Sequence, residues 1–348
     1  MDVTPIIRSS EYLAAILKRS LCPSCNISNV PPRIPFRNFC INNFIFISLE
    51  YFFVSNSYTI EKYKEAGKIA SKIKRKILPN VVKVGTSLKE VCEVIERYII
   101  EQGAIPAFPV NIGINEIAAH FTPSLTSKEF LPPDSIVKID FGVSIDGYIV
   151  DTAISFPLSK GFKRIVETNR MALNRAISTI HAGSSFNSYA KCVSREITDK
   201  GFKVIQNLTG HRIERFTLHT GDSIPNIPEW TNRGSFRAYN VYALEPFATY
   251  SEAAGYVVER NDSYIFRIKG LKPPAKYRKS WLILYRKFNG LPFTIRWLSS
   301  SERRYFKDLI EINLVHSYPV LVEASNKPVS QAEETILVLP EKVVILTK

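Results

Sequence analysis

The sequence predicts an α/β (α+β) fold built from two similar halves, and three observations support this fold class. Helix patterns followed by strand patterns occur twice, about a hundred residues apart. In each copy the second helix lies between two glycines of identical spacing, Gly85 to Gly103 and Gly183 to Gly201. In the first copy, Asp146-Gly147 separates two strand-like runs. We expect the two halves to pack about a pseudo-two-fold axis.

Two helices and a hairpin make up the predicted first half. Isoleucines recur at four-residue intervals up to Pro79, which predicts a helix that ends at this proline. Ser87-Leu88-Lys89-Glu90 has the spacing of a capping box, because serine and glutamate side chains can each accept a free backbone N–H of a first helical turn. A second helix is therefore expected up to Gly103. Residues 135–140 and 148–156 predict the two strands of the hairpin.

The second half repeats this order and carries an insertion. Helices are expected at about residues 163–181 and around Tyr189 to Ile197. Strand patterns follow at 239–245 and 256–258, and again near the carboxyl end at 334–338 and 343–346. Between about residues 262 and 316 the pattern is helical once more. We interpret this stretch as an inserted helical subdomain.

The composition excludes a disordered chain and an integral membrane protein. Of the 348 residues, 45% are apolar and 22% charged, as in ordinary globular proteins. No apolar run reaches the roughly 20 residues of a membrane-spanning helix. The five cysteines are odd in number and widely spread, which argues against a secreted disulfide framework. The start also lacks the pattern of a signal peptide. We expect a cytoplasmic protein that is a monomer.

The net charge of +14 favours contact with polyanions such as RNA or the surface of a ribosome. Much of the surplus falls within the predicted insert, where residues 262–311 hold twelve basic and four acidic side chains. A solvated basic surface without a partner is the competing interpretation.

Residues 1–56 differ from the rest of the chain. They contain Pro31-Pro32 and show no sustained helical period. The motif Cys22-Pro23-Ser24-Cys25 has no second cysteine pair at zinc-finger spacing, and Cys40 offers only a third ligand, so reduced, unpaired thiols are favoured. We treat this segment as an atypical N-terminal extension that need not belong to the mature protein.

Asp140 and Asp151 are the first candidates for chemistry, one on each arm of the hairpin. For a turn centred between Ile145 and Asp146, the two residues pair directly, with their side chains about 5 Å apart. Two carboxylates at this separation require a shared proton or a cation between them. A solvent-facing pair without function is the alternative.

Further ionisable residues lie in apolar surroundings. His211 and His219 are eight residues apart in strand-like sequence, so both can face one cavity. Glu245 and Glu333 border apolar strands, where a buried carboxylate is costly without a partner such as a metal ion. His120 also has apolar neighbours, although a single histidine of this kind is more often a structural core residue.

In chain order these motifs resemble the methionine aminopeptidases, in the archaeal form of the type 2 branch. The motifs are KIDFGVSIDGYIVDTA at 138–153, Gly210-His211 with LHTG at 218–221, Leu244-Glu245-Pro246-Phe247, and Gln331-Ala332-Glu333-Glu334-Thr335. The type 2 likeness rests on the helical insert with residues 290–298, and on 317–321. The resemblance covers about residues 59–348 and implies the pita-bread fold, with a catalytic domain at 57–348.

The resemblance also implies a site around two divalent metal ions. Four carboxylates and one imidazole suit Co, Mn, Fe or Zn without selecting among these metals. The bound ions activate the water that attacks the substrate. The implied metal ligands are Asp140, Asp151, His211, Glu245 and Glu333, with Asp151 and Glu333 reaching both ions. By the same resemblance, Glu245 relays a proton, His219 binds the substrate carbonyl or oxyanion, and His120 contacts the scissile amide nitrogen. Phe108, Leu218 and Tyr318 match positions of the methionine pocket.

The implied activity is removal of the initiator methionine from nascent polypeptides whose second residue is small. Contact with the ribosome through the basic insert is compatible with it. Two residues depart from the family pattern, since Ala332 and Glu334 stand where phenylalanine and histidine are usual. A proline-specific peptidase shares the ligand set, but the insert argues against it. A non-catalytic relative that binds RNA or ribosomes is the third alternative, and such relatives typically lose metal ligands.

Overall fold

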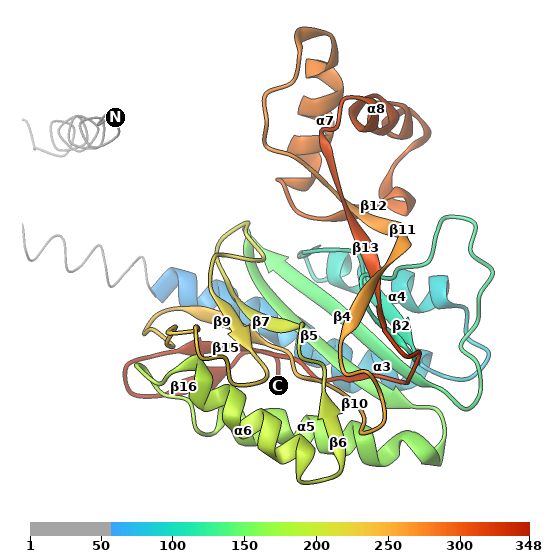
Figure 1. The fold of residues 1–348 in the computed structure, drawn as a ribbon. Coiled ribbons are helices and arrows are strands. Elements are labelled where there is room, and N and C mark those ends of the chain that lie inside the picture. Colours follow the sequence, from blue (N-terminus) through green and yellow to red (C-terminus); the bar gives the residue numbers. More distant parts are fainter. Residues whose placement is uncertain (1–56) are drawn as a thin grey trace, which may run out of the picture. The chain divides into compact units, whose positions relative to one another are not determined.

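Two groups of helices frame the part of the chain that this computed structural model describes, residues 57–348 (Figure 1). The first group begins with a continuous helical stretch over residues 57–81 and ends with α4; the second consists of α5 and α6. Their bounds are η2 Ile73–Ile77 and α3 Leu78–Val81 within the first stretch, α4 Leu88–Glu101, α5 Lys163–Ile177 and α6 Phe186–Thr198. The predictions for residues 1–56, including the Cys22–Cys25 motif, lie outside the described residues.

The repeated glycines bound matching helices in the two halves. Gly85 and Gly183 precede α4 and α6 with φ angles of 83° and 91°, and Gly103 and Gly201 follow these helices with φ angles of 76° and 80°. Positive φ is readily adopted only by glycine, so the spacing reflects equivalent turns. The predicted repeat of helices and strands is confirmed.

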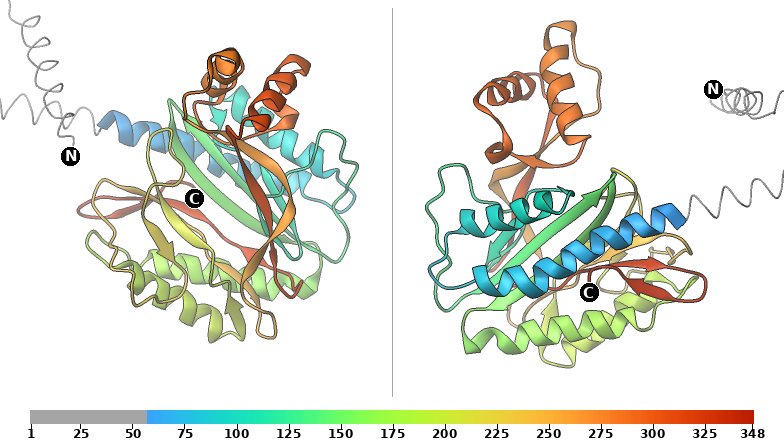
Figure 2. Two further views of the ribbon diagram at one scale, coloured as in Figure 1. Left: turned by 45° about the horizontal axis from the view of Figure 1, so that its top comes forward. Right: turned by 180° about the vertical axis from the view of Figure 1, so that it is seen from behind.

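The described residues form four sheets (Figures 1 and 2). In the first half, β4 pairs with β1, β2 and β5. The second half contains the sheet β16-β15-β9-β7-β8 and the small sheet β14-β10-β6, and the fourth sheet is β12-β11-β13-β3. The strands are β1 Ile105–Pro106, β2 Asn111–Ile114, β3 Ile117–Ala119, β4 Ile136–Ile145, β5 Tyr148–Pro157, β6 Phe202–Val204, β7 Thr209–Ile213, β8 Ser223–Pro225, β9 Val241–Leu244, β10 Phe247–Tyr250, β11 Val257–Ile268, β12 Phe293–Thr294, β13 Val315–Glu323, β14 Ser330–Gln331, β15 Glu334–Val338 and β16 Val343–Ile345.

The β4–β5 hairpin is present, but its register differs from the prediction. Asp140 lies opposite Ala153, and Asp151 lies opposite Gly142. The turn therefore centres on Asp146-Gly147, where both residues have positive φ, and not between Ile145 and Asp146. Asp140 and Asp151 are diagonal neighbours on one face of the hairpin, where Cα separations are typically about 7–8 Å. They still face the same side because their register positions differ by two residues.

One predicted helix boundary is wrong, and one predicted helix cap is absent. Pro79 does not end the first helix, because the chain continues from the π-helical turn η2 into α3, whose first turn contains Pro79. Ser87 is the N-cap residue of α4, but its hydroxyl makes no capping bond. The backbone N–H of Leu88 instead donates to the carbonyl of Glu129 at 3.0 Å. The helix therefore starts where the sequence predicted, but without the predicted capping bond from Ser87.

The helical region between β11 and β13 consists of α7 (Arg278–Phe288) and α8 (Ser300–Glu311), with the short turns η4 (Ala275–Tyr277) and η5 (Ile295–Trp297). Residues 262–268 and 315–316, at the margins of the predicted insert, belong to strands β11 and β13. Seven buried apolar residues, among them Leu284 and Phe306, give this region its own small core. In Figure 1 these helices stand above the sheets at the end of the long β11–β13 ribbon. Among residues 57–348, no helix is long and apolar enough to cross a bilayer.

Candidate active site

All the predicted site residues line one cavity of about 260 Å³. Its walls come from both halves, because β4 and β5 meet the sheet of β7, β9 and β15 through a bridge between Ala153 and Glu333. The lining includes Phe108, His120, Asp140, Asp151, His211, Leu218, His219, Glu245, Tyr318 and Glu333. Residues that are more than 200 positions apart in the chain thus line the same cavity.

Four carboxylates and one imidazole form the floor of this cavity. The ligand atoms of Asp151, His211 and Glu333 all lie within 4.8 Å of one another. The Nε2 atom of His211 is 3.6 Å from Asp151 and 3.6 Å from Glu245. Asp140 lies beside them on β4. Asp151, His211 and Glu333 are each at most 5% exposed.

This group is electrostatically incomplete without a cation. Burial raises the pKa of Asp140 to about 7. Burial, followed by repulsion from the neighbouring carboxylates, raises the pKa values of Asp151, Glu245 and Glu333. Among residues 57–348, no lysine or arginine lines this cavity.

Two carboxylate oxygens in the group also lack hydrogen-bond partners. Oδ1 of Asp140 and Oδ1 of Asp151 are buried, and within residues 57–348 neither finds a donor. Buried charges require pairing or metal coordination. The donor set, rich in oxygen with one imidazole, therefore fits divalent metal ions.

Three histidines surround the carboxylates in a neutral state. Burial lowers the pKa of His211 and of His120, and lowers that of His219 to about 4. The rings of His211 and His219 are 4.1 Å apart between centroids. His219 lies in the loop after β7 and not in a strand as expected, yet it reaches the same cavity.

His120 is oriented by its backbone and by one hydrogen bond. Its φ angle of 62° is unusual for a residue other than glycine, and such conformations cluster at functional sites. The Nδ1 atom is 3.2 Å from the carbonyl oxygen of Pro319. Because this carbonyl can only accept, Nδ1 carries the proton, and Nε2 of the neutral ring is left as an acceptor.

The apolar side of the cavity contains the three predicted pocket residues. Phe108 is 5% exposed and packs over Gly142 of β4, where a Cβ atom would be 2.5 Å from the phenylalanine ring. Tyr318 contacts His120 edge to face, with 5.6 Å between ring centroids. Leu218 also lines the cavity.

The structure adds lining residues that the sequence did not single out. They are Asn111, Asn207, Thr209, Ile265 and Pro292, among others. Asn111 lies directly opposite Asp140 in the β2–β4 pairing, and its buried Oδ1 has no hydrogen-bond partner in the described part of the chain. Its proximity depends on a strand pairing between distant segments, so only the isolated polar residue after Pro109-Val110 could have drawn attention to it.

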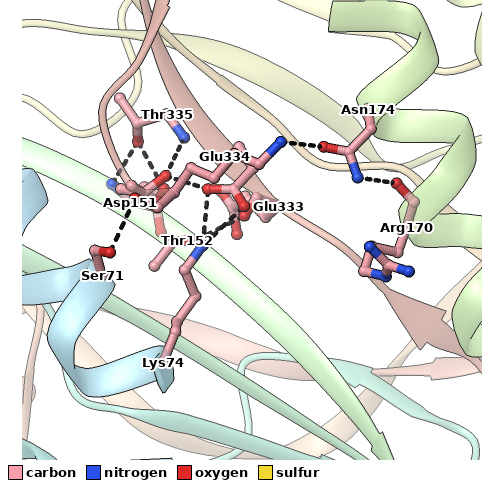
Figure 3. Close-up of polar contacts among 11 residues, drawn as sticks. Ser71, Lys74, Asp151, Thr152, Arg170, Asn174, Glu333, Glu334 and Thr335 are labelled. Carbon is pink, nitrogen blue, oxygen red and sulfur yellow. Dashed lines mark hydrogen bonds and ion pairs between the residues drawn. The ribbon is translucent and has the colours of Figure 1, made fainter. Parts of the chain in front are cut away.

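Glu333 and Glu334 point in opposite directions, as strand alternation requires. Glu333 lines the cavity, whereas the carboxylate of Glu334 is 2.7 Å from Nζ of Lys74 on the other side of the strand (Figure 3). The additional carboxylate of this chain is therefore paired with a cation outside the metal cavity.

Comparison with known proteins supports the interpretation of this cavity as a metal-binding site. Residues 61–269 match the model of metallopeptidase family M24. The methionine aminopeptidase of Methanocaldococcus jannaschii is 40% identical over 292 residues, which cover 83% of this chain and 98% of that protein. That of Thermococcus onnurineus is 39% identical and is covered to 97%.

The chain belongs to the methionine aminopeptidase family. It is thus a metal-dependent hydrolase, and family M24 membership implies binding of divalent metal ions. The predicted pita-bread fold is confirmed by solved structures of this group. A methionine aminopeptidase from Thermotoga maritima has a TM-score of 0.62 at 21% identity, covering 84% of this chain and 97% of that one. A prolidase from Pyrococcus furiosus has a TM-score of 0.55 at 15% identity, covering 84% and 64%.

A thermophilic Arx1 has a TM-score of 0.72 at 15% identity, covering 83% of this chain and 90% of that one. At such identities the likeness of methionine aminopeptidase, prolidase and Arx1 structures concerns the fold alone.

Proposed function

We propose that this chain is a type 2 methionine aminopeptidase that removes the initiator methionine from nascent polypeptides with a small second residue, in the cytoplasm. The coarser activity, metal-dependent removal of an N-terminal methionine, follows from family membership. One observation carries the proposal for this site, namely the convergence of four carboxylates and His211 in a cavity without a cationic side chain in its lining. The helical region between β11 and β13 supports the type 2 assignment.

In this proposal two divalent ions would be held by Asp140, Asp151, His211, Glu245 and Glu333, and Asp151 and Glu333 would serve both ions. Four carboxylates then balance two divalent charges, which removes the cost of burying the carboxylates alone. When bound, such ions lower the pKa of a water molecule and polarise the substrate carbonyl.

The remaining side chains bind and orient the substrate. Glu245 holds the proton that passes to the departing amine. His219, neutral because its pKa is lowered to about 4 by burial, donates a hydrogen bond to the substrate carbonyl. Nε2 of His120 accepts from the scissile amide N–H, since its Nδ1 already donates to Pro319. Phe108, Leu218 and Tyr318 surround the unbranched thioether of methionine.

Peptide cleavage by the purified protein tests the proposal and separates it from a proline-specific activity. We expect release of methionine from Met-Ala-Ser after addition of Mn²⁺ or Co²⁺, little release after chelation, and no cleavage of an Ala-Pro peptide. Metal titration should saturate at two ions per chain, and Glu333→Gln should lose most of the activity. Failure to release methionine with any divalent ion would refute the proposal, and cleavage of Ala-Pro alone would favour the rival.

We further propose that residues 57–348 form the catalytic domain and that residues 1–56 are an extension not required for catalysis. A chain that starts at residue 57 should then release methionine at the rate of the full chain. A large loss of activity in the shortened chain, with its fold intact by circular dichroism, would contradict this division.

The exposed cations of the α7 region support contact with the ribosome. Lys272, Lys276, Arg278, Lys279 and Arg286 are all exposed. Polyanion binding of this kind weakens as salt displaces it. Co-sedimentation with ribosomes should therefore decrease at high salt and in the variant Arg278→Glu/Lys279→Glu. Insensitivity to both changes would count against docking.

A further inference from the structure

Lys74 meets Glu334 and Thr152 next to the carboxylate cavity but is not part of the cavity lining (Figure 3). Its Nζ donates to both carboxylate oxygens of Glu334, at 2.8 and 2.7 Å, and to Oγ1 of Thr152 at 3.1 Å. The side chains of Lys74 and Glu334 are 11% and 17% exposed. The ammonium group therefore has three fixed acceptors in a largely enclosed environment.

The partners of Lys74 are the chain neighbours of two proposed metal ligands. Thr152 follows Asp151 on β5, and Glu334 follows Glu333 at the start of β15. Because successive strand residues face opposite sides, a group that holds Thr152 and Glu334 from behind also determines where Asp151 and Glu333 project in front. One side chain thus connects the backbones of both residues proposed to reach both ions.

The hydroxyl of Thr152 transmits this connection to Glu333. Oγ1 of Thr152 accepts a hydrogen bond from Lys74 and donates its own proton to the carbonyl oxygen of Glu333, at 2.7 Å. The N–H of Glu333 donates to the carbonyl of Ala153 at 3.0 Å. Lys74 therefore completes a set of hydrogen bonds that joins the strand of Asp151 to the segment of Glu333.

Lys74 is itself held in place by its helix. It lies in the π-helical turn η2, a type of irregularity often found at functional sites. One turn earlier, Ser71 donates to the carbonyl of Lys348 at 2.9 Å. At Gly67 an added Cβ would be 2.1 Å from the carbonyl oxygen of Leu346, so the helix touches the carboxyl-terminal segment through its backbone. The helix cannot shift here without disturbing that segment.

We propose that Lys74 and Glu334 form a positioning pair that holds Asp151 and Glu333 at the separation required for metal binding. This inference rests on the proposed metal-ligand set. It adds a role for a carboxylate at a position where the family usually has histidine. Groups that orient metal ligands from behind typically contribute 10–100-fold to metal affinity or activity.

Mn²⁺ titration of the metal-stripped full chain, followed by calorimetry, separates positioning from simple charge compensation. Charge alone predicts that Lys74→Met tightens Mn²⁺ binding, that Glu334→Gln weakens it, and that Lys74→Met/Glu334→Gln binds as the wild type does. Positioning predicts that the double variant binds Mn²⁺ at least about tenfold more weakly. Thr152→Val should weaken binding in the same direction, and Lys74→Arg, which keeps the cation, should restore most of the affinity relative to Lys74→Met.

Glu302→Gln is the matched control. Glu302 also receives two hydrogen bonds from a lysine, Lys287, at 2.8 and 2.9 Å, and its side chain is 17% exposed, like that of Glu334. It lies in α8, so its loss should leave the affinity for Mn²⁺ within about twofold of wild type. Wild-type affinity in the double variant, or an equal loss in Glu302→Gln, would overturn the inference. A wild-type chain that binds no Mn²⁺ would instead refute the metal site itself, and this inference with it.

Discussion

The ion pair between Glu96 of α4 and Arg296 of η5 fastens the helical region to the first half of the molecule. Both Nη atoms of Arg296 donate to Glu96 at 2.9 Å. The side chain of Arg296 is 3% exposed and that of Glu96 is 7% exposed. Arg296→Met would leave the Glu96 carboxylate buried, with Trp297 and the N–H of Val110 as remaining donors. Breaking one side of a buried pair costs about 3–5 kcal/mol. Since two donors remain, we expect a loss of about 3 kcal/mol in the free energy of unfolding.

Urea unfolding followed by circular dichroism would measure this loss. The control is Arg296→Met/Glu96→Met, which removes both charges and should recover most of the stability, because apolar residues can replace a buried ion pair at little cost. Arg296 also donates to Thr122 and to the carbonyl of Pro123, close to His120, so KM should rise in the single variant. A stability loss under about 1 kcal/mol, or a double variant no more stable than the single one, would refute the reasoning.

Two further predictions concern the cavity. In the metal-free protein the pKa of Asp140 is raised to about 7, so at this group the folded state binds more protons than the unfolded state and its contribution to stability is lost as pH rises. The buried histidines act in the opposite direction, because their pKa values are lowered and they take up protons on unfolding. Comparison with Asp140→Asn isolates the carboxyl group: between pH 6.5 and 8 the chelated wild type should lose about 1 kcal/mol of unfolding free energy relative to this variant. Parallel pH profiles of the two chelated proteins in urea denaturation would contradict the assignment. Gly142→Ala should raise KM for Met-Ala-Ser severalfold, because its Cβ would displace Phe108, and an unchanged KM would argue against Phe108 as a pocket wall.

The order of helices and strands could be predicted from the sequence because it depends on local patterns. Buried positions of α4 recur every three or four residues from Leu88 to Ile99, and Asp146-Gly147 lies at a tight turn. Local signals could not show where a distant segment pairs with the start of a helix. The hydroxyl of Ser87 makes no capping bond, and Ser87 instead forms a bridge with Phe130.

The candidate ligands could also be named from the sequence, whereas their geometry could not. A carboxylate in apolar sequence, such as Glu333, is conspicuous because burying it alone is unfavourable. The diagonal placement of Asp140 and Asp151 depends on a hairpin register that differs from the predicted one by two residues. The position of Asn111 next to Asp140 could not be predicted, because it depends on the pairing of β2 with β4.

Glu334 shows most clearly what the sequence determines and what only the tertiary structure decides. The residue pattern alone shows an additional acid beside Glu333 and tells which kinds of side chain are available for coordination. The packing of a helix against paired strands decides which face each acid occupies. It also brings Lys74 to Glu334, although the two residues are 260 positions apart in the chain. Composition and periodicity act over a few residues, so they determine the elements and the chemical groups; electrostatic balance acts through space, so only the folded chain decides which charges neutralise one another.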